Sequence, residues 1–185
     1  QAANLYRDFQ EHAKEAKCCR TILENYETDN MEMLDRCISL HKRLGDWRGA
    51  AELLEKTDFV PDLAMAVNYY EEVRCYKEAG QVCERLAAKN GNSRPSWLRK
   101  AAALYKNGGH HVEQLQILEQ LCEWQECGEL ACSLKKFAKA ADFFFTFGDF
   151  HRAVECRLEA KDFEGAYSLL QDTGMQDIKL KIKCL

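Results

Sequence analysis

The sequence predicts an all-α protein, a row of short antiparallel helix hairpins with about thirteen residues per helix. First, residues 124–171 repeat with a step of thirteen residues, and each unit carries an aromatic residue at the same place. These aromatic residues are Trp124, Phe137, Phe150 and Phe163. Second, small or medium-sized residues follow three and four places later, a spacing that puts all of them on one face of a helix. Third, the unit is long enough for about three helical turns and a tight turn.

The same step extends towards the N-terminus. Leu98 and His111 keep the interval of thirteen residues. Leu63 and Tyr76 share it, whereas Trp47 is displaced by three residues. Self-similarity at a fixed period is the sequence signature of a solenoid, in which each helix buries its apolar face against its neighbours. We therefore expect about a dozen helices joined by very short turns.

The aromatic residues are expected to be packing anchors in the core of this array. Replacing Phe150 by alanine is then expected to cost about 3–5 kcal/mol of stability, the usual range for such a core change. The small residues after each aromatic, such as Ala153, are expected to let helices approach closely. Enlarging Ala153 is expected to cost about 1–3 kcal/mol through overpacking.

The N-terminal elements are predicted from apolar spacing and from residues typical of helix ends. Residues 1–28 have helical spacing without strand-like alternation, and Asp29 or Asn30 suits the cap of a second helix. Gly45 suits the left-handed residue that follows a helix end, and Asp46 suits the N-cap of the next helix. A new helix is expected after each pair of helix-ending and helix-capping residues of this kind along the chain.

The domain organisation is predicted from one clear loop. Residues 89–96 (KNGNSRPS) are rich in Gly, Asn, Ser and Pro, which favours a boundary between two helical sub-arrays. The sub-arrays are expected at 1–88 and 97–174. Residues 175–185 alternate apolar and basic residues, which is strand spacing, but with no second strand nearby we expect a tail or truncated helix.

Composition argues for a folded, soluble protein. Apolar residues make up 46% and charged residues 30% of the chain, and the formal net charge is −4. A nucleic-acid binder usually carries a basic excess, which this chain lacks. No run approaches the roughly 20 apolar residues of a membrane span, and the amphipathic N-terminus does not look like a signal peptide. We expect a cytoplasmic protein, and an excerpt of a longer one since no initiating Met is present.

Ten cysteines are the unusual feature of the composition. Most stand where a helix would place a small apolar residue, so reduced, buried thiols are favoured over a disulfide scaffold. Cys122, Cys127 and Cys132, with His110 and His111 nearby, are the strongest candidates for zinc ligands. Their spacing is longer than a zinc knuckle and turns by about 500° along a helix, so buried small residues are preferred.

Three smaller features remain to be interpreted. In the adjacent pair Cys18 and Cys19, one thiol is expected to be buried and the other half-exposed, rather than both forming a redox site. His110 and His111 are expected to begin a helix. Four phenylalanines, at 143, 144, 145 and 147, exceed what one buried stripe needs. Either one of them is exposed and marks a partner groove, or a central helix buries them all.

Three segments share a recognisable pattern. Gly45–Ala51, Gly148–Val154 and Lys161–Tyr167 resemble the G-D-aromatic-x-x-A hairpins of TPR-like α-solenoids, found in vesicle-coat subunits, clathrin heavy chain and intraflagellar-transport proteins. The resemblance covers most of residues 34–173 and implies a right-handed solenoid with a scaffold role in a large assembly. Two steps here make 26 residues, not the 34 of the consensus repeat, and the W-x2-L-G-x2-Y signature is absent. No functional residue is carried over.

The leading functional hypothesis is therefore a non-catalytic scaffold that binds protein partners. No nucleophile elbow, Walker loop, zinc-protease motif or dinucleotide fingerprint occurs, and no cofactor is implied. The alternative is an accessory helical domain of an RNA-binding protein or nucleic-acid enzyme, in which an aromatic and basic surface stacks and clamps single-stranded RNA. The residues of that surface are Arg94, Trp97, Arg99, Lys100 and Lys106.

Overall fold

A computed structural model describes residues 2–25 and 31–173, and within the first helix it describes the side chains of residues 10–21. This part of the chain is all-α, as predicted, with eleven α-helices, one 3₁₀ helix and no strand. In order they are α1 (Ala2–Asn25), α2 (Met31–Arg43), α3 (Trp47–Thr57), α4 (Val60–Glu72), α5 (Tyr76–Lys89), η1 (Gly91–Ser93), α6 (Arg94–Gly108), α7 (His111–Gln120), α8 (Trp124–Ser133), α9 (Phe137–Phe147), α10 (Phe150–Glu159) and α11 (Phe163–Asp172). None of these helices is long and apolar enough to cross a membrane.

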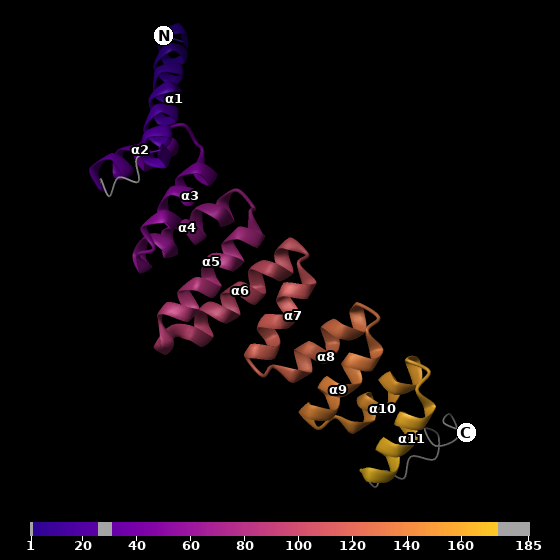
Figure 1. Cartoon of the computed structure of the whole chain (residues 1–185). Coiled ribbons are helices and arrows are strands. Elements are labelled where there is room, and N and C mark those ends of the chain that lie inside the picture. Colours follow the sequence, from indigo (N-terminus) through magenta and orange to yellow (C-terminus); the bar gives the residue numbers. More distant parts are fainter. Residues whose placement is uncertain (1, 26–30, 174–185) are drawn as a thin grey trace. The chain divides into compact units, whose positions relative to one another are not determined.

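The chain divides into two compact units, Gln1–Gly109 and His110–Leu185. Within each unit the helices that pack extensively against one another are consecutive in sequence, from α1 to α6 in unit 1 and from α7 to α11 in unit 2 (Figure 1). Packing between sequence neighbours is the contact pattern of a helical repeat. The described part of the chain is therefore solenoid-like.

The step of thirteen residues is confirmed in unit 2. Its helices begin at His111, Trp124, Phe137, Phe150 and Phe163, so each expected anchor is the first residue of a helix. In unit 1 the pattern is less regular. Trp47 and Tyr76 also begin helices, but Leu63 lies one turn inside α4 because that helix begins at Val60, just before Pro61.

The tight turns follow one backbone design. Gly148 has φ +93°, its N–H donates to the carbonyl of Phe145 over 3.0 Å, and the N–H of Asp149 donates to the carbonyl of Phe144 over 2.9 Å. This pair of bonds is the Schellman motif, which satisfies the last carbonyls of a helix. Gly45 and Asp46 repeat it.

The residue after a left-handed turn position occupies the N-cap of the next helix, and at three turns it is an aspartate whose side chain caps that helix. The side chain of Asp149 accepts a hydrogen bond from the backbone N–H of Arg152, and those of Asp46 and Asp162 make the equivalent bond. The G-D-aromatic pattern thus records three consecutive roles, namely the left-handed turn residue, the N-cap and the first helical residue. Lys161 takes the turn position with φ +60°, which shows that glycine is not obligatory there.

Glycines in the helices allow close packing, as the sequence predicted for its small residues. A Cβ on Gly128 of α8 would lie 2.6 Å from a ring carbon of Phe144 in α9. A Cβ on Gly80 of α5 would lie 2.5 Å from the ring of Tyr105 in α6. Each aromatic ring therefore packs directly on the backbone of the preceding helix, and this contact recurs in both units.

The expectation that Phe150 is a core anchor is wrong. Phe150 is 38% exposed and Phe163 is 49% exposed, whereas Phe144 is 2% exposed. The first residue of a helix lies beside the turn, where neighbouring helices cover only part of its ring. Phe144 lies in the middle of its helix, packed with Ala140, Ala141 and Ala153. Ala153 is fully buried, which agrees with the expectation that this small residue lets helices approach closely.

The break between units differs from the expected boundary at 89–96. Helix α5 continues to Lys89, η1 spans Gly91–Ser93, and α6 begins at Arg94 with Pro95 in its first turn. Because proline is well tolerated in the first helical turn, this segment forms a tight connection instead of a spacer. Helices α5 and α6 pack against each other, and the break follows Gly109. The tail at 175–185 lies outside the described residues.

Candidate functional site

A groove with a volume of about 800 Å³ opens on unit 2, between side chains of α8, α9, α10 and α11. Its lining consists of Glu129, Cys132, Phe137, Phe144, Arg152, Glu155, Cys156, Leu158, Glu159 and Phe163. The volume falls within the range of pockets that hold small molecules or a few side chains. The groove therefore has room for part of a bound segment.

The apolar part of the groove results from the repeat design. The ring of Phe144 packs closely on α8 because Gly128 has no side chain there. Buried Cys156 lies in the same apolar cluster as Phe144. Phe137 and Phe163 are the first residues of α9 and α11, and their partly exposed rings line the same space. The exposed helix-start aromatics thus contribute surface to the groove instead of filling the core.

Arg152 is the only cation among the lining residues, and its guanidinium is engaged on three sides. Nε lies 2.5 Å from Oδ2 of Asp149, one terminal nitrogen lies 3.3 Å from Oε1 of Glu129, and the guanidinium carbon lies 4.5 Å above the ring of Phe144. Hydrogen bonds from the Arg152 guanidinium and then from its backbone N–H hold the pKa of Asp149 below its usual range. Arg152 therefore links Asp149, the N-cap of α10, to Glu129 of α8 across the ring of Phe144.

Three carboxylates line the groove beside this arginine. Glu129 and Glu155 have side chains that are 53% and 51% exposed, and Glu159 is exposed as well. His151 Nδ1 lies 3.7 Å from Oε2 of Glu155. With Arg152 held by Asp149 and Glu129, the groove presents an acidic rim above an apolar floor.

A second apolar surface lies at the turn between α9 and α10. Phe145, Phe147 and Phe150 are 46%, 50% and 38% exposed, and the rings of Phe145 and Phe150 are 5.5 Å apart. Because successive residues turn by about 100° on a helix, the four phenylalanines cannot share one face. Phe144 is buried and Phe143 partly buried, so the expectation of an exposed aromatic is confirmed by Phe145 and Phe147, whereas their role in a partner groove stays a prediction.

The cysteines behave largely as predicted. Nine of the ten lie in the described residues and all nine are free thiols, with Cys184 outside that part. The expectation of buried small residues is confirmed for Cys127 but is wrong for Cys122, which is exposed at a left-handed turn position with φ +56°. No group of three or more potential metal ligands gathers in the part of the chain that the structure describes. Cys19 is buried and Cys18 exposed. Burial raises the pKa of Cys83 and of Cys127 to about 12, so both thiols stay protonated at neutral pH.

One thiol contact was missed from the sequence. Sγ of Cys132 lies 3.4 Å from Sγ of Cys156, and both residues line the groove. Burial, followed by the hydrogen bond with Cys132, raises the pKa of Cys156 to about 12. The available signal was the repeat step, because residues about two steps apart occupy similar places on alternate helices.

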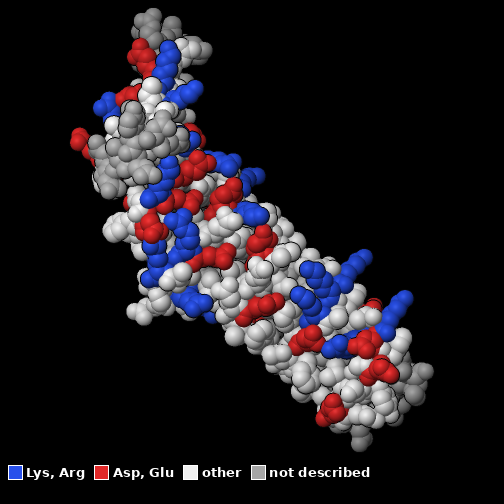
Figure 2. Space-filling view, in the orientation of Figure 1, with Lys and Arg blue, Asp and Glu red and all other residues white. Residues whose placement is uncertain are grey.

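The five residues of the predicted RNA surface all lie on α6, but the structure divides their roles. Lys100 Nζ lies 2.8 Å from Oε2 of Glu71 on α4, so its charge is neutralised within unit 1. Trp97 is half-buried, whereas Arg94, Arg99 and Lys106 are exposed. Basic and acidic side chains lie interspersed on the face shown in Figure 2. RNA binding by this surface stays a prediction.

As expected, His110 and His111 stand at the start of α7.

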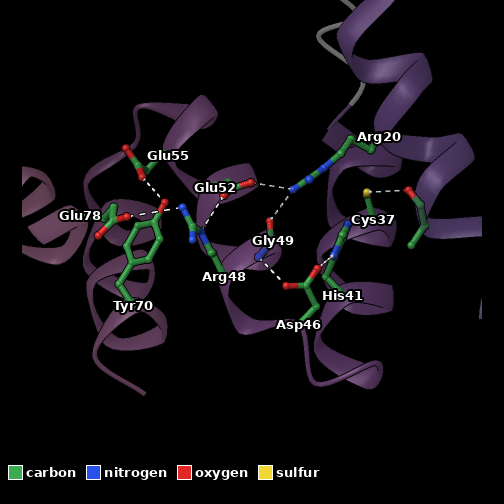
Figure 3. A network of polar contacts seen from close by, with 11 residues as sticks. Arg20, Cys37, His41, Asp46, Arg48, Gly49, Glu52, Glu55, Tyr70 and Glu78 are labelled. Atoms are coloured by element: carbon green, nitrogen blue, oxygen red, sulfur yellow. Dashed lines mark hydrogen bonds and ion pairs between the residues drawn. The ribbon is translucent and has the colours of Figure 1, made fainter. Parts of the chain in front are cut away.

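A polar network in unit 1 ties several helices together (Figure 3). Arg20 of α1 lies 3.0 Å from Glu52 of α3, which accepts a second bond from Arg48, and Arg48 reaches Glu78 of α5 over 3.5 Å. Nearby, His41 Nδ1 lies 2.7 Å from the capping carboxylate of Asp46. Because every member contacts another helix or a cap, this network explains packing and gives no indication of catalysis.

Comparison with known proteins adds little to this geometry. No protein-family model matches the chain, and no curated protein matches it. Among solved structures, the chain is similar to the crystal structure of BtubC (BKLC) from P. vanneervenii, with 15% sequence identity and a TM-score of 0.29. The match covers 98% of this chain and 88% of that one. At this score the similarity carries no argument about family or function.

Proposed function

We propose that this chain is a non-catalytic helical-repeat scaffold that binds protein partners within a larger multidomain protein or assembly of the transport-coat or cilium type. In this proposal the helices form a right-handed, TPR-like solenoid of antiparallel hairpins in a cytoplasmic protein. The observation that supports it best is the groove of unit 2, with exposed aromatic rings at its edge. Exposed apolar patches of this kind, rimmed by polar residues, are typical of protein interaction sites.

A capture experiment with matched variants tests this proposal. The whole chain, its Phe163→Ser variant and its Phe59→Ser variant are immobilised and exposed to cell extract, both with and without nuclease treatment. Phe163 lines the groove, whereas Phe59 is more exposed at 61% and lies in unit 1, so it controls for a lost surface aromatic. Circular dichroism confirms that each variant is folded.

We expect a defined set of proteins on the wild-type chain and on Phe59→Ser, and its loss on Phe163→Ser. Equal retention by all three chains would contradict a role of the groove. Capture that disappears with nuclease, and that is restored by added RNA, would instead support the alternative of an RNA-binding accessory domain.

A further inference from the structure

The geometry points to a specific partner chemistry for the groove of unit 2: we propose that it binds a peptide segment of a partner protein that carries apolar side chains next to lysine or arginine. This inference rests on the proposed scaffold function and names the class of partner. It follows from the placement of the acidic rim, from the engagement of Arg152, and from the apolar floor.

Two rim carboxylates stand where their own helix disfavours them. Glu155 and Glu159 are four residues apart on α10, so they lie on one face, and like charges at this spacing destabilise a helix. Glu159 is also the last residue of α10, where the helix dipole disfavours a negative charge. Both nevertheless line the groove. Breaking a local rule at a concave surface is typical of functional sites, and a cation from a partner would relieve both repulsions.

The chain's own cation does not provide this relief. Arg152 is held by Asp149 and Glu129 and lies over the ring of Phe144, so its guanidinium is directed at these groups and not at Glu155 or Glu159. His151 lies 3.7 Å from Glu155 and contributes charge only when protonated. The rim therefore retains an excess of negative charge that a lysine or arginine of a partner can match.

The floor specifies the other half of the partner. Phe137, Leu158 and Phe163 present apolar surface inside the same space of about 800 Å³. Burial of an aliphatic or aromatic side chain there supplies affinity, while the carboxylates select the flanking charge. A phosphorylated or acidic segment, and the backbone of RNA, would be repelled by the three glutamates. The complementary ligand is therefore an apolar and basic peptide.

Fluorescence anisotropy with defined peptides tests this inference on the full chain. The probe is a fluorescein-labelled peptide LKKLLKKL, and the controls are LEELLEEL, which reverses its charge, and GKKGGKKG, which removes its apolar side chains. The double variant Glu155→Gln with Glu159→Gln removes the rim charge. Glu119→Gln is the matched control, because Glu119 is an exposed carboxylate in the last turn of α7, outside the groove.

We expect LKKLLKKL to bind the wild-type chain and the Glu119→Gln variant alike, with weaker binding as salt increases. The double variant is expected to lose about tenfold in affinity, which corresponds to about 1.4 kcal/mol for the two exposed charge pairs together. LEELLEEL is expected not to bind. Equal binding of GKKGGKKG would show unspecific charge attraction, and equal binding to the double variant would exclude the groove, so either result overturns the inference.

The outcomes also separate this inference from the proposed function. Capture of proteins that depends on Phe163, combined with no binding of LKKLLKKL, would retain the scaffold and refute the partner chemistry. Absence of groove-dependent capture would refute the scaffold whatever the peptides do. Sedimentation that shows a dimer of the wild-type chain, abolished by Phe163→Ser, would assign the groove to a second copy of the chain and overturn the inference.

Discussion

Replacing Gly128 by alanine tests the close contact between helices α8 and α9. The added Cβ would lie 2.6 Å and 2.7 Å from two ring carbons of Phe144, a distance that forces the ring or the helix to move. Phe144 is 2% exposed and packs with Ala140, Ala141 and Ala153, so any movement of its ring disturbs these core contacts. The same substitution removes a glycine from the interior of α8, which by itself favours the helix.

The two effects have opposite signs and comparable sizes. Helix propensity favours alanine over glycine by about 0.8–1 kcal/mol. Overpacking of a filled core typically costs about 1–3 kcal/mol. We therefore expect Gly128→Ala to destabilise the wild-type chain by about 1 kcal/mol. In a Phe144→Leu background, where a smaller and more flexible side chain yields, the same substitution is expected to stabilise the chain by up to about 1 kcal/mol.

A double-mutant cycle measures this change of sign. Urea unfolding is followed by the fluorescence of Trp124, which begins α8 and stacks on Phe143 with ring centroids 6.3 Å apart. Trp47 and Trp97 are replaced by phenylalanine in every variant, so that the signal reports on unit 2 alone. This matters because repeat proteins often unfold in parts and then have no single unfolding free energy.

The reasoning is refuted if Gly128→Ala stabilises both backgrounds equally, because the coupling energy between the two positions would then be zero. Gly80→Ala provides an independent repetition in unit 1, where the added Cβ meets the ring of Tyr105 at 2.5 Å. These variants retain Trp47 and Trp97 and carry Trp124→Phe, so that their fluorescence reports on unit 1. The same sign is expected there against the wild-type and Tyr105→Leu backgrounds. A destabilised Gly80→Ala with an unaffected Gly128→Ala would show that the contact is important in only one unit.

Three further predictions concern caps, exposure and thiols. Asp149→Ala is expected to lower the unfolding free energy by about 0.5–2 kcal/mol through the loss of the N-cap. Because the pKa of Asp149 is lowered in the folded chain, this stabilisation should be present above about pH 4 and fade at lower pH. Urea midpoints measured against pH, with Asp149→Asn as control, test both expectations. Phe150→Ala is expected to lower the unfolding free energy by less than about 1 kcal/mol, because the ring is partly exposed, and Ala153→Leu by about 1–3 kcal/mol, because Ala153 is fully buried. A larger loss for Phe150→Ala than for Ala153→Leu in thermal melts would contradict the partial exposure of Phe150. Since the pKa of Cys156 is raised to about 12, the stabilisation that its neutral thiol provides should be complete below about pH 9 and fall between about pH 9 and 12, with a smaller fall in Cys156→Ala. The rate of alkylation of Cys156 by iodoacetamide should increase over the same pH range. Rapid alkylation at pH 7 would disprove the raised pKa.

Local structure was predictable because its causes lie within a few residues. The turn at Gly148 and the cap at Asp149 need only a residue that accepts φ near +90° and a carboxylate next to it, and both are visible in the sequence. The start of α10 at Phe150 follows from these two residues. In unit 1 the regular step fails at Leu63, because Pro61 moves the helix start to Val60. A local signal therefore overrides the repeat where the two disagree.

The candidate groove was predictable only in outline. The run of phenylalanines predicted an exposed aromatic, but the exposed Phe145 and Phe147 belong to the second apolar surface and do not line the groove. The carboxylates of Glu155 and Glu159 were not singled out, because acidic residues on a helix are usually a solvated face. The contact of Cys132 with Cys156 joins alternate helices, and no local pattern reports which residues meet at that distance.

By itself the sequence determined that the chain is helical, how long the helices of unit 2 are, and which residues end and cap them. The tertiary structure alone decided which aromatic is core and which is surface: Phe144 and Phe150 are both phenylalanines in the repeat, yet one is 2% and the other 38% exposed. Capping and periodicity depend on the backbone within one or two turns, whereas burial depends on whether a neighbouring helix covers the ring. The acidic rim and the apolar floor become one groove for the same reason, since four helices must pack before their side chains share a space.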